Sequence, residues 1–491
     1  MGRGLLTSGL DLAATLLVAS APLAAAAEPD SSLPLGQVVG RVSCRDNGVQ
    51  SYALYLPSGY RPDRPWPILY AFDPAARGRV PVELFSKAAE RLGYIVVGSN
   101  NSRNGPVEPV VAAMNALWSD THARFVLDPE RIYATGMSGG NYPARLLLAQ
   151  RGAGMVACAG AFVEDDIANV EPRHTWIAIA GVSDFNFDLN RAAVRALVAR
   201  GVVARFVTFD GGHSWPPEAV VSQALDWLEL AAMRTGKRQP DPTFVEAQFQ
   251  GGLARARALV AGGQVHDAAD ENATLVREFA GLKPAGTLQA LAREADGLGK
   301  SPEAKKARKR EQSLARDEKA QGDRLRSLRW RLEQDPREQM QHALSQATDD
   351  PMALWDPGAT RRELDDLLKR LARDLDSAQA DRRIVSKRVI DGFYIDTLYQ
   401  GQQHRDQRRL VAAQADFEIC IGMRPKASAP VYDLARTHAA QGDRKQALAR
   451  LRAAMELGFR DLGRLDTDPE WAPLHEQPEF QAIASEKSLD P

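Results

Sequence analysis

Short apolar runs alternate with longer segments of helical periodicity from about residue 36 to residue 235, and this alternation restricts the fold more than any other feature. The apolar runs are rich in β-branched residues, and the segments between them are long enough for crossover helices. This is the pattern of an α/β domain with a largely parallel, doubly wound sheet. We predict eight strands, with the sequences QVVGRV, SYALYLP, PILYAF, YIVVGSN, RIYATG, MVACAGAF, TWIAIAG and ARFVTFD.

The composition changes after Lys237, where the β-rich runs stop. Residues 245–380 are dominated by Ala, Leu, Arg, Glu and Gln, which predicts a charged, solvent-exposed helical region. The basic run KKARKR is followed by EQ and RDE, so it is interpreted as a solvated helix face and not as a polyanion-binding patch. The predicted division of the chain is a signal peptide 1–27, an α/β domain 28–237, a charged helical region 238–380 and a helical-repeat domain 381–491.

The C-terminal segment VYDLARTHAAQGDRKQALARLRAAMELGF predicts two helices around a turn at Gly442. Apolar residues recur on their facing sides, namely Leu434, Ala435, Ala447, Leu451 and Ala454. This spacing resembles a tetratricopeptide repeat, and the segment that ends at Pro425 resembles a divergent one. Such units bury their faces only against neighbours, so we expect a small helical array whose surface could take a protein or peptide partner.

The N-terminus has the layout of a secretory signal peptide. One early Arg is followed by a mostly apolar stretch from Leu12 to Ala26 and by small residues before Glu28. This predicts a secreted or periplasmic protein with no stable membrane span in its mature form. The alternative is a short buried or membrane-anchoring helix, but Asp11 interrupts the apolar run and leaves it short for crossing a bilayer.

The overall charge and the cysteine pattern give no support for a nucleic-acid-binding protein or a disulfide-stabilised one. The formal net charge of the 491 residues is -1, which gives no reason to expect nucleic acid as a partner. The three cysteines, Cys44, Cys158 and Cys420, do not have the pattern of a disulfide framework. Cys158 lies in the run MVACAGAF and is interpreted as a small buried hydrophobic residue. No group of residues with metal-ligand spacing is evident.

A G-x-S-x-G pattern at residues 136–140 joins the predicted strand RIYAT to the amphipathic helix NYPARLLLAQ. The spacing alone is common, but the position between a strand and a helix is that of a nucleophile elbow. The glycines would let the backbone turn sharply, so that the Ser138 hydroxyl projects above the carboxyl edge of the sheet. The amide of Gly139 would then point to the place where an acyl oxyanion forms.

A serine hydroxyl needs a base before it becomes a good nucleophile. His213 follows the last strand in the Gly-rich loop FDGGHSWPP and is the predicted base, whereas His122 and His174 are interpreted as structural or exposed. The orienting carboxylate is predicted to be Asp184, just past the strand TWIAIAG, with Asp188 as the alternative. The chain order Ser, Asp, His is that of α/β-hydrolases.

The segments SYALYLPSGYRPDRPWPILYAFDP, DPERIYATGMSGG and GGHSWP resemble secreted α/β-hydrolases of the polyhydroxybutyrate depolymerase and feruloyl or acetylxylan esterase group. The resemblance covers residues 36–235. It implies hydrolysis of carboxylic esters, without a metal or organic cofactor, by Ser138, Asp184 and His213 as nucleophile, acid and base.

The loop after the third strand departs from this family. The usual His-Gly pair is replaced by Phe72-Asp73-Pro74-Ala75, and Pro74 has no N–H to donate. The second oxyanion donor is therefore expected to be the amide of Ala75.

The surroundings of the predicted site favour a large substrate. No insertion between the sixth and seventh strands is long enough for a cap, which predicts an open site suited to bulky or polymeric acyl groups. In the loop GSNNSRNGP, the side chains of Asn100, Asn101 and Arg103 either line the pocket or form a hydrogen-bonded turn.

The sequence thus favours an exported serine esterase whose chemistry resides in residues 28–237. The alternatives are a scaffold protein that uses the helical repeats and has a feeble hydrolase domain, and a serine peptidase with the same triad.

Overall fold

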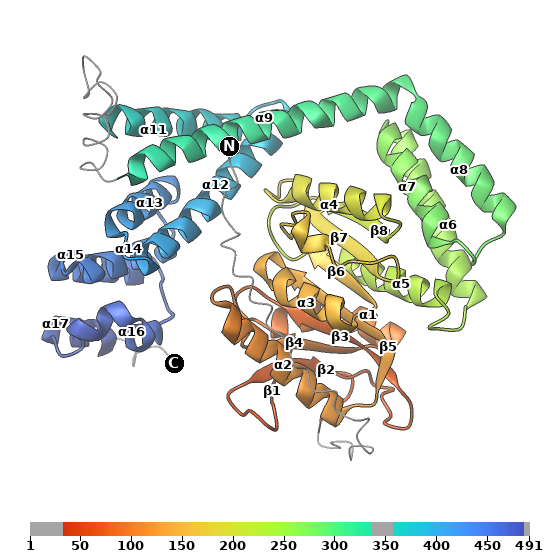
Figure 1. The fold of residues 1–491 in the computed structure, drawn as a ribbon, viewed down its shortest axis with the longest axis horizontal. Helices are drawn as coiled ribbons and strands as arrows, with labels where there is room; N and C mark the ends of the chain where they lie inside the picture. The colour runs from red at the N-terminus through yellow and green to blue at the C-terminus, as the bar shows by residue number, and fades with distance from the viewer. Residues whose placement is uncertain (1–32, 335–356, 486–491) are drawn as a thin grey trace.

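The computed structural model describes residues 33–334 and 357–485 (Figure 1). The predicted signal peptide 1–27 lies outside these residues. The first half holds one eight-stranded sheet in the order β1-β2-β4-β3-β5-β6-β7-β8. Its strands are β1 (Val38–Ser43), β2 (Ser51–Tyr55), β3 (Trp66–Phe72), β4 (Ile95–Ser99), β5 (Leu127–Met137), β6 (Gly154–Cys158), β7 (Thr175–Gly181) and β8 (Val203–Phe209). The strand β2 is antiparallel to both of its neighbours and all other pairs are parallel, so the predicted eight-stranded, mostly parallel sheet of an α/β domain is confirmed.

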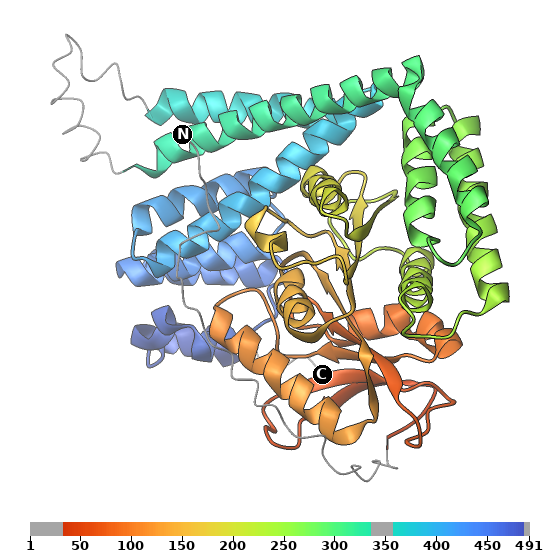
Figure 2. The ribbon, with the colours of Figure 1, turned by 45° about the vertical axis from the view of Figure 1, so that its right-hand side comes forward.

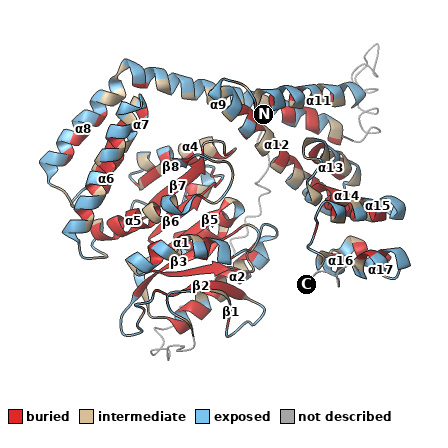
Figure 3. Ribbon diagram, turned by 180° about the vertical axis from the view of Figure 1, so that it is seen from behind, coloured by how far each residue is buried: buried red, intermediate tan, exposed pale blue. Residues whose placement is uncertain are grey.

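Helices cover both faces of this sheet, as the alternation of side chains along the strands requires. On β3, Ile68 and Tyr70 belong to the core beneath α2 (Val107–Arg124), α3 (Asn141–Arg151) and α4 (Phe187–Ala199). Leu69 points to the other face and packs beneath α1 (Arg79–Leu92) and α5 (Glu218–Arg234). The buried strands between the two helical layers are visible in Figure 3.

The second half of the described chain is helical. Its helices are α6 (Pro242–Ala261), α7 (Val265–Glu278), α8 (Ala285–Lys300), α9 (Pro302–Glu333), α11 (Pro357–Asp374), α12 (Ala380–Asp406), α13 (Leu410–Met423), α14 (Ser428–Gln441), α15 (Arg444–Glu456), α16 (Arg464–Thr467) and α17 (Pro478–Ser485). Two of them start at a capping residue followed by proline: Asp241 accepts from the Thr243 and Phe244 amides, and Ser301 accepts from the Ala304 amide. Among the described helices, none combines the length and apolar character needed to cross a lipid bilayer.

The helical region curves around the α/β part. In Figures 1 and 2, α6 to α8 lie on one side of the sheet domain, α9 passes over it, and α13 to α17 lie on the other side. The composition break at Lys237 falls in the connection between α5 and α6. The basic run at residues 305–310 lies on α9 with its charged side chains exposed, as predicted, and Arg310 pairs with Asp381 at the start of α12.

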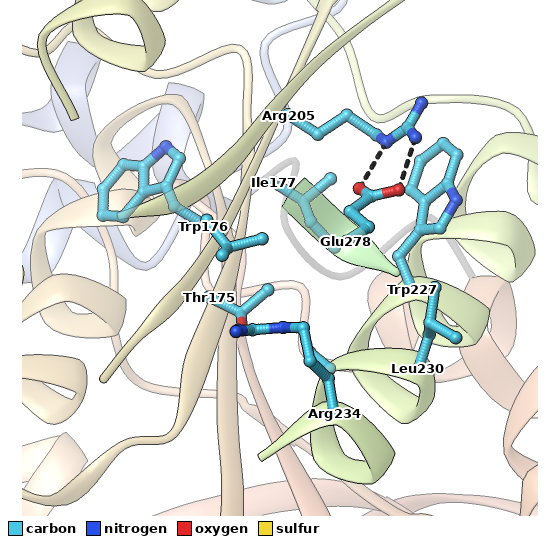
Figure 4. Close-up of a pocket in the computed structure, with 10 residues that line it drawn as sticks. Thr175, Trp176, Ile177, Arg205, Trp227, Leu230, Arg234 and Glu278 are labelled. Atoms are coloured by element: carbon cyan, nitrogen blue, oxygen red, sulfur yellow. Dashed lines mark hydrogen bonds and ion pairs between the residues drawn. The ribbon is translucent and has the colours of Figure 1, made fainter. Parts of the chain in front are cut away.

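A buried ion pair joins the helical region to the sheet at β8. Arg205 of β8 donates to Glu278 of α7 over 2.8 and 2.6 Å (Figure 4). It also donates to Glu271 over 2.6 Å. The guanidinium also lies 4.2 Å above the Trp227 ring. Burying an arginine is tolerable only when it is paired in this way. The small pocket beside the pair includes Thr175, at the amino end of β7, so it lies at the sheet edge opposite the carboxyl ends of the strands.

The C-terminal helices include the predicted helix pair. The helix α14 ends at Gly442, which adopts the left-handed region with φ 81°, and Asp443 caps α15 by accepting from the Gln446 amide. The buried residues Ala435, Ala447, Leu451 and Ala454 pack in one cluster, as their spacing predicted, whereas Leu434 packs with Ala413 and Phe417 of α13. The two-helix arrangement is therefore confirmed, while the tetratricopeptide assignment stays a prediction.

The three cysteines are unpaired and buried. Burial raises the pKa of the Cys158 thiol to about 12, so this group is inert at neutral pH. This agrees with its interpretation as a small hydrophobic residue.

Candidate active site

Ser138 follows the end of β5, on a tight turn that leads into α3. Its φ of 52° is in the left-handed region, which non-glycine residues rarely adopt. A Cβ on Gly136 would lie 2.2 Å from the Gly140 carbonyl oxygen, and one on Gly140 would lie 2.0 Å from the Phe72 carbonyl oxygen. Both glycines of the G-x-S-x-G pattern are therefore required by close backbone approaches.

The predicted base and acid lie next to the serine. The Ser138 Oγ and His213 Nε2 atoms are 2.8 Å apart, and His213 Nδ1 and Asp184 Oδ1 are 2.9 Å apart. Asp184 is fully buried, and its Oδ1 also accepts from the Asn186 amide over 2.9 Å. Its Oδ2 has no hydrogen-bond partner among the described residues.

Two loops hold this arrangement together. The Ser183 amide, beside Asp184, donates to the Gly211 carbonyl over 2.9 Å, which ties the loop after β7 to the loop after β8. The Phe185 ring stacks on the His213 imidazole with ring centres 4.1 Å apart. With the imidazole proton on Nδ1 facing the carboxylate, Nε2 can accept the serine proton.

The other predicted alternatives lie apart from this group. Asp188 is on α4 and pairs with Arg191 over 2.5 Å, so the structure favours Asp184 over Asp188. The His122 Nδ1 atom lies 2.9 Å from the Trp118 carbonyl on its own helix. His174 is buried and accepts from the Glu171 amide, and burial lowers its pKa to about 4. Neither histidine contacts the serine.

The two predicted oxyanion donors differ in their surroundings. Gly139 follows Ser138 in a short 3-10 turn at the start of α3, and the amide of Gly139 has no hydrogen-bond partner among the described residues outside that turn. The Ala75 amide instead donates to the Asp73 carboxylate over 2.9 Å. In this conformation Ala75 does not offer its amide to an oxyanion, because the Asp73 side chain folds back on its own loop.

Asp73 also links this loop to the histidine loop. Besides the Ala75 amide, its buried carboxylate accepts from Arg77 Nε over 2.9 Å and from Trp215 Nε1 over 2.9 Å. Trp215 is two residues after His213. Asp73 thus supplies an anchor for the loop that carries the candidate base.

The loop after β4 contributes a residue that the sequence analysis missed. Asn100 donates to the Gly40 carbonyl of β1 and Asn101 accepts from the Ser51 amide of β2, so both side chains bind this loop to neighbouring strands. Asn104 instead lies against Gly139: a Cβ built on that glycine would be 1.9 Å from Asn104 Oδ1. No motif marks Asn104, because its role depends on how two distant loops meet.

A further group of polar side chains is buried in the helical region. The ligand atoms of Glu333, His404 and Asp416 all lie within 4.8 Å of one another, which the sequence analysis did not foresee. Nδ1 of His404 lies 2.9 Å from Asp416, its Nε2 lies 3.1 Å from Arg409, and Arg329 pairs with Glu333 over 2.8 Å. The group joins α9, α12 and α13, but Glu333 Oε1 and Asp416 Oδ1 have no hydrogen-bond partner among the described residues.

Comparisons with known proteins find likeness in structure only. No family model matches the sequence, and no curated protein does. A ferulic acid esterase is similar with a TM-score of 0.33 and 17% identity, over 40% of this chain and 98% of that one. The fluorophosphonate-binding serine hydrolase FphF of Staphylococcus aureus has a TM-score of 0.33 and 14% identity, over 39% and 97% of the two chains. Esterase 2 of Thermogutta terrifontis has a TM-score of 0.33 and 16% identity, over 42% and 95%.

Proposed function

We propose that this chain is a serine hydrolase that cleaves carboxylic esters through an acyl-enzyme. The observation that carries the proposal is the continuous series of hydrogen bonds from Ser138 through His213 to Asp184. A serine that only filled a turn would need neither partner. The backbone strain at Ser138 supports the same role, since strained residues persist where they serve a function.

In the proposed reaction, Ser138 Oγ attacks the ester carbonyl carbon while His213 Nε2 takes the hydroxyl proton. The tetrahedral intermediate then loses the alcohol, whose oxygen takes that proton from His213. Water attacks the acyl-serine by the same steps and releases the acid. Asp184 holds the Nδ1 proton in place and stabilises the imidazolium that forms in each half of the reaction.

The oxyanion is proposed to bind to the Gly139 amide, and a second amide from Ala75 would join only when its bond to Asp73 opens. Losing one donor typically costs about 2.7–4 kcal/mol of transition-state stabilisation. We therefore expect slow turnover on small esters in comparison with enzymes that have two preformed donors.

Labelling with a fluorophosphonate probe tests the proposal. We expect the wild-type protein to be labelled, and Ser138→Ala and His213→Ala to lose labelling and hydrolysis of p-nitrophenyl esters while they keep the wild-type melting temperature. Ser86→Ala is the matched control, because Ser86 lies on α1 and bonds only to its own helix. Full activity in Ser138→Ala would disprove the assignment, and faster cleavage of peptides than of esters would identify a peptidase.

Export and large substrates belong to the same proposal. We propose that residues 1–27 are removed on secretion, and a mature N-terminus near Glu28, measured by mass spectrometry on protein from the periplasm or medium, is the result expected. We propose that the substrate is a bulky or polymeric ester. We also propose that the helical array binds a peptide or protein partner.

A further inference from the structure

One face of helix α12 contacts the loop that carries Asp184 and the loop after β4, although this helix belongs to the other half of the chain. Arg388, Gly392 and Tyr399 are spaced by four and seven residues, and at 3.6 residues per turn this spacing places them on one stripe of the helix. Each of them touches a different residue near the nucleophile or its partners.

Arg388 is bound to the acid loop. Its Nε and Nη2 atoms donate to the Val182 carbonyl over 2.9 and 2.7 Å, two residues before Asp184. The guanidinium lies 4.0 Å above the Phe187 ring, and its Nη1 lies 3.3 Å from Glu318 of α9. A buried arginine with these partners cannot leave the loop without losing the hydrogen bonds that compensate its burial.

Gly392 lies against Phe185, whose ring stacks on the imidazole of His213. A Cβ on Gly392 would be 3.0 Å from Phe185 Cβ, closer than side chains normally pack. Glycine is unfavourable inside a helix, and this close approach accounts for its presence in α12. Phe185 therefore lies between α12 and the His213 imidazole and contacts both.

Tyr399 reaches the nucleophile side of the site. Its hydroxyl accepts from Asn104 Nδ2 over 2.6 Å, and the Asn104 side chain covers Gly139. Because the hydroxyl oxygen is the acceptor in this bond, its own proton remains available to a substrate oxygen. The Tyr399 side chain is 46% exposed, so it can meet a substrate that enters from solvent.

We propose that α12 forms one side of the esterase site and takes part in catalysis there. Arg388 and Gly392 are positioning residues for the Asp184 and His213 loops, and Tyr399 holds Asn104 beside Gly139 and offers its hydroxyl to the ester. This inference rests on the proposed ester hydrolysis and goes beyond it, because it makes the helical half part of the catalyst. Residues 159–174, between β6 and β7, contain only a short 3-10 turn, and on this inference α12 bounds one side of the open site.

A pair of glycine substitutions tests the positioning role in the full-length protein. Gly392→Ala and Gly297→Ala each replace a glycine inside a helix by a better helix former, but a Cβ on Gly297 meets open space. We expect Gly392→Ala to lower kcat on a small chromogenic ester by about ten- to a hundredfold, because small displacements of catalytic groups are costly. KM should stay within about twofold of wild type, and the melting temperature should not fall. Gly297→Ala should retain wild-type kinetics.

A second pair tests the substrate side. Tyr399→Phe removes only the hydroxyl, and we expect kcat/KM to fall about three- to tenfold, the value of one hydrogen bond. Gln403→Ala, at an exposed position of the same helix, is the control and should match wild type.

The outcomes separate this inference from the proposed function. Wild-type kinetics in both Gly392→Ala and Tyr399→Phe, in a protein that the fluorophosphonate probe labels at Ser138, would overturn the role of α12 and leave the esterase proposal intact. If Gly392→Ala lowers the melting temperature, Tyr399→Phe decides, since removing a surface hydroxyl does not unfold the chain. A wild-type protein that is neither labelled nor active would overturn both.

Discussion

Gly139 and Gly140 are neighbours, but a side chain added at each would clash with a different kind of group. A Cβ on Gly140 would be 2.0 Å from the Phe72 carbonyl oxygen, which belongs to the backbone of a central strand. A Cβ on Gly139 would be 1.9 Å from Asn104 Oδ1, the end of a side chain that can rotate away. The same substitution at the two positions therefore separates folding from catalysis.

We expect Gly140→Ala to lose about 1–3 kcal/mol of unfolding free energy or more, because the strand cannot yield. Gly139→Ala should keep its stability but lose activity, since the new methyl group displaces Asn104 from its place beside the nucleophile. Denaturant unfolding and ester hydrolysis measured on both variants check this. Equal losses of stability in the two variants would contradict the geometry.

Single residues of the site were predictable where chemistry limits the choice. Ser138, Asp184 and His213 each follow a strand, and few residue types can serve their roles. The hydrogen bond that engages the Ala75 amide was not predictable, because it depends on the rotamer of Asp73. Asn104 carries no sequence signal, since asparagine is common in loops.

At the scale of elements, Asp73 fastens the loop after β3 to the loop after β8. Burial raises the pKa of this carboxyl, but hydrogen bonds from Arg77, Trp215 and the Ala75 amide outweigh burial and hold the pKa below its ordinary value of 3.8. Because the folded-state pKa is the lower one, this stabilisation is present above pH 3.8 and disappears as the pH falls through the folded-state value.

Asp73→Asn should therefore lower the melting temperature at pH 7, and the difference from wild type should shrink toward pH 3. The loosened Trp215 should also reduce ester hydrolysis. Glu83→Gln is the control: Glu83 pairs with Arg79 on an exposed face of α1, where an ion pair contributes little. A difference in melting temperature that stays constant between pH 3 and pH 7 would disprove the role of the charge.

The strands were more predictable than the docking of the helices. All eight strands stand out as short apolar runs bounded by turns, and the central parallel ones are also rich in β-branched residues because both of their faces are buried. The helical structure of α12 was expected, but the contacts of one of its faces with loops near the triad were not. Its three contact residues are an arginine, a glycine and a tyrosine, and nothing in local periodicity indicates which distant loops they meet.

At the scale of the whole molecule, Glu318 lies where α9, α12 and α4 meet. Burial and the nearby Asp188 raise its pKa to about 7, although Arg388 and Arg191 oppose this shift. A carboxyl whose folded-state pKa lies above its usual 4.5 favours the folded state below that value, and this contribution is lost as the pH rises through 7.

Wild-type protein should accordingly gain stability when the pH falls from 8 to 5.5, as far as Glu318 contributes. In Glu318→Gln, which resembles the protonated side chain, this part of the pH dependence should vanish, and the variant should be the more stable protein at pH 8. Thermal unfolding of wild type and Glu318→Gln at pH 8 and pH 5.5 measures this pH dependence. Glu303→Gln, on the exposed part of α9, is the control. A Gln variant less stable than wild type at pH 8 would show that the ionised pair with Arg388 prevails.

The bond between Arg388 and Val182 spans 206 positions of the chain, and this separation has a consequence during translation. At roughly 5–20 residues per second, a ribosome needs about 10–40 seconds to pass from one residue to the other. Once His213 has been added, the nascent α/β domain has its serine, histidine and aspartate but still lacks α12. If α12 positions these loops as proposed, a chain that stops before α12 is made should lack full ester hydrolysis.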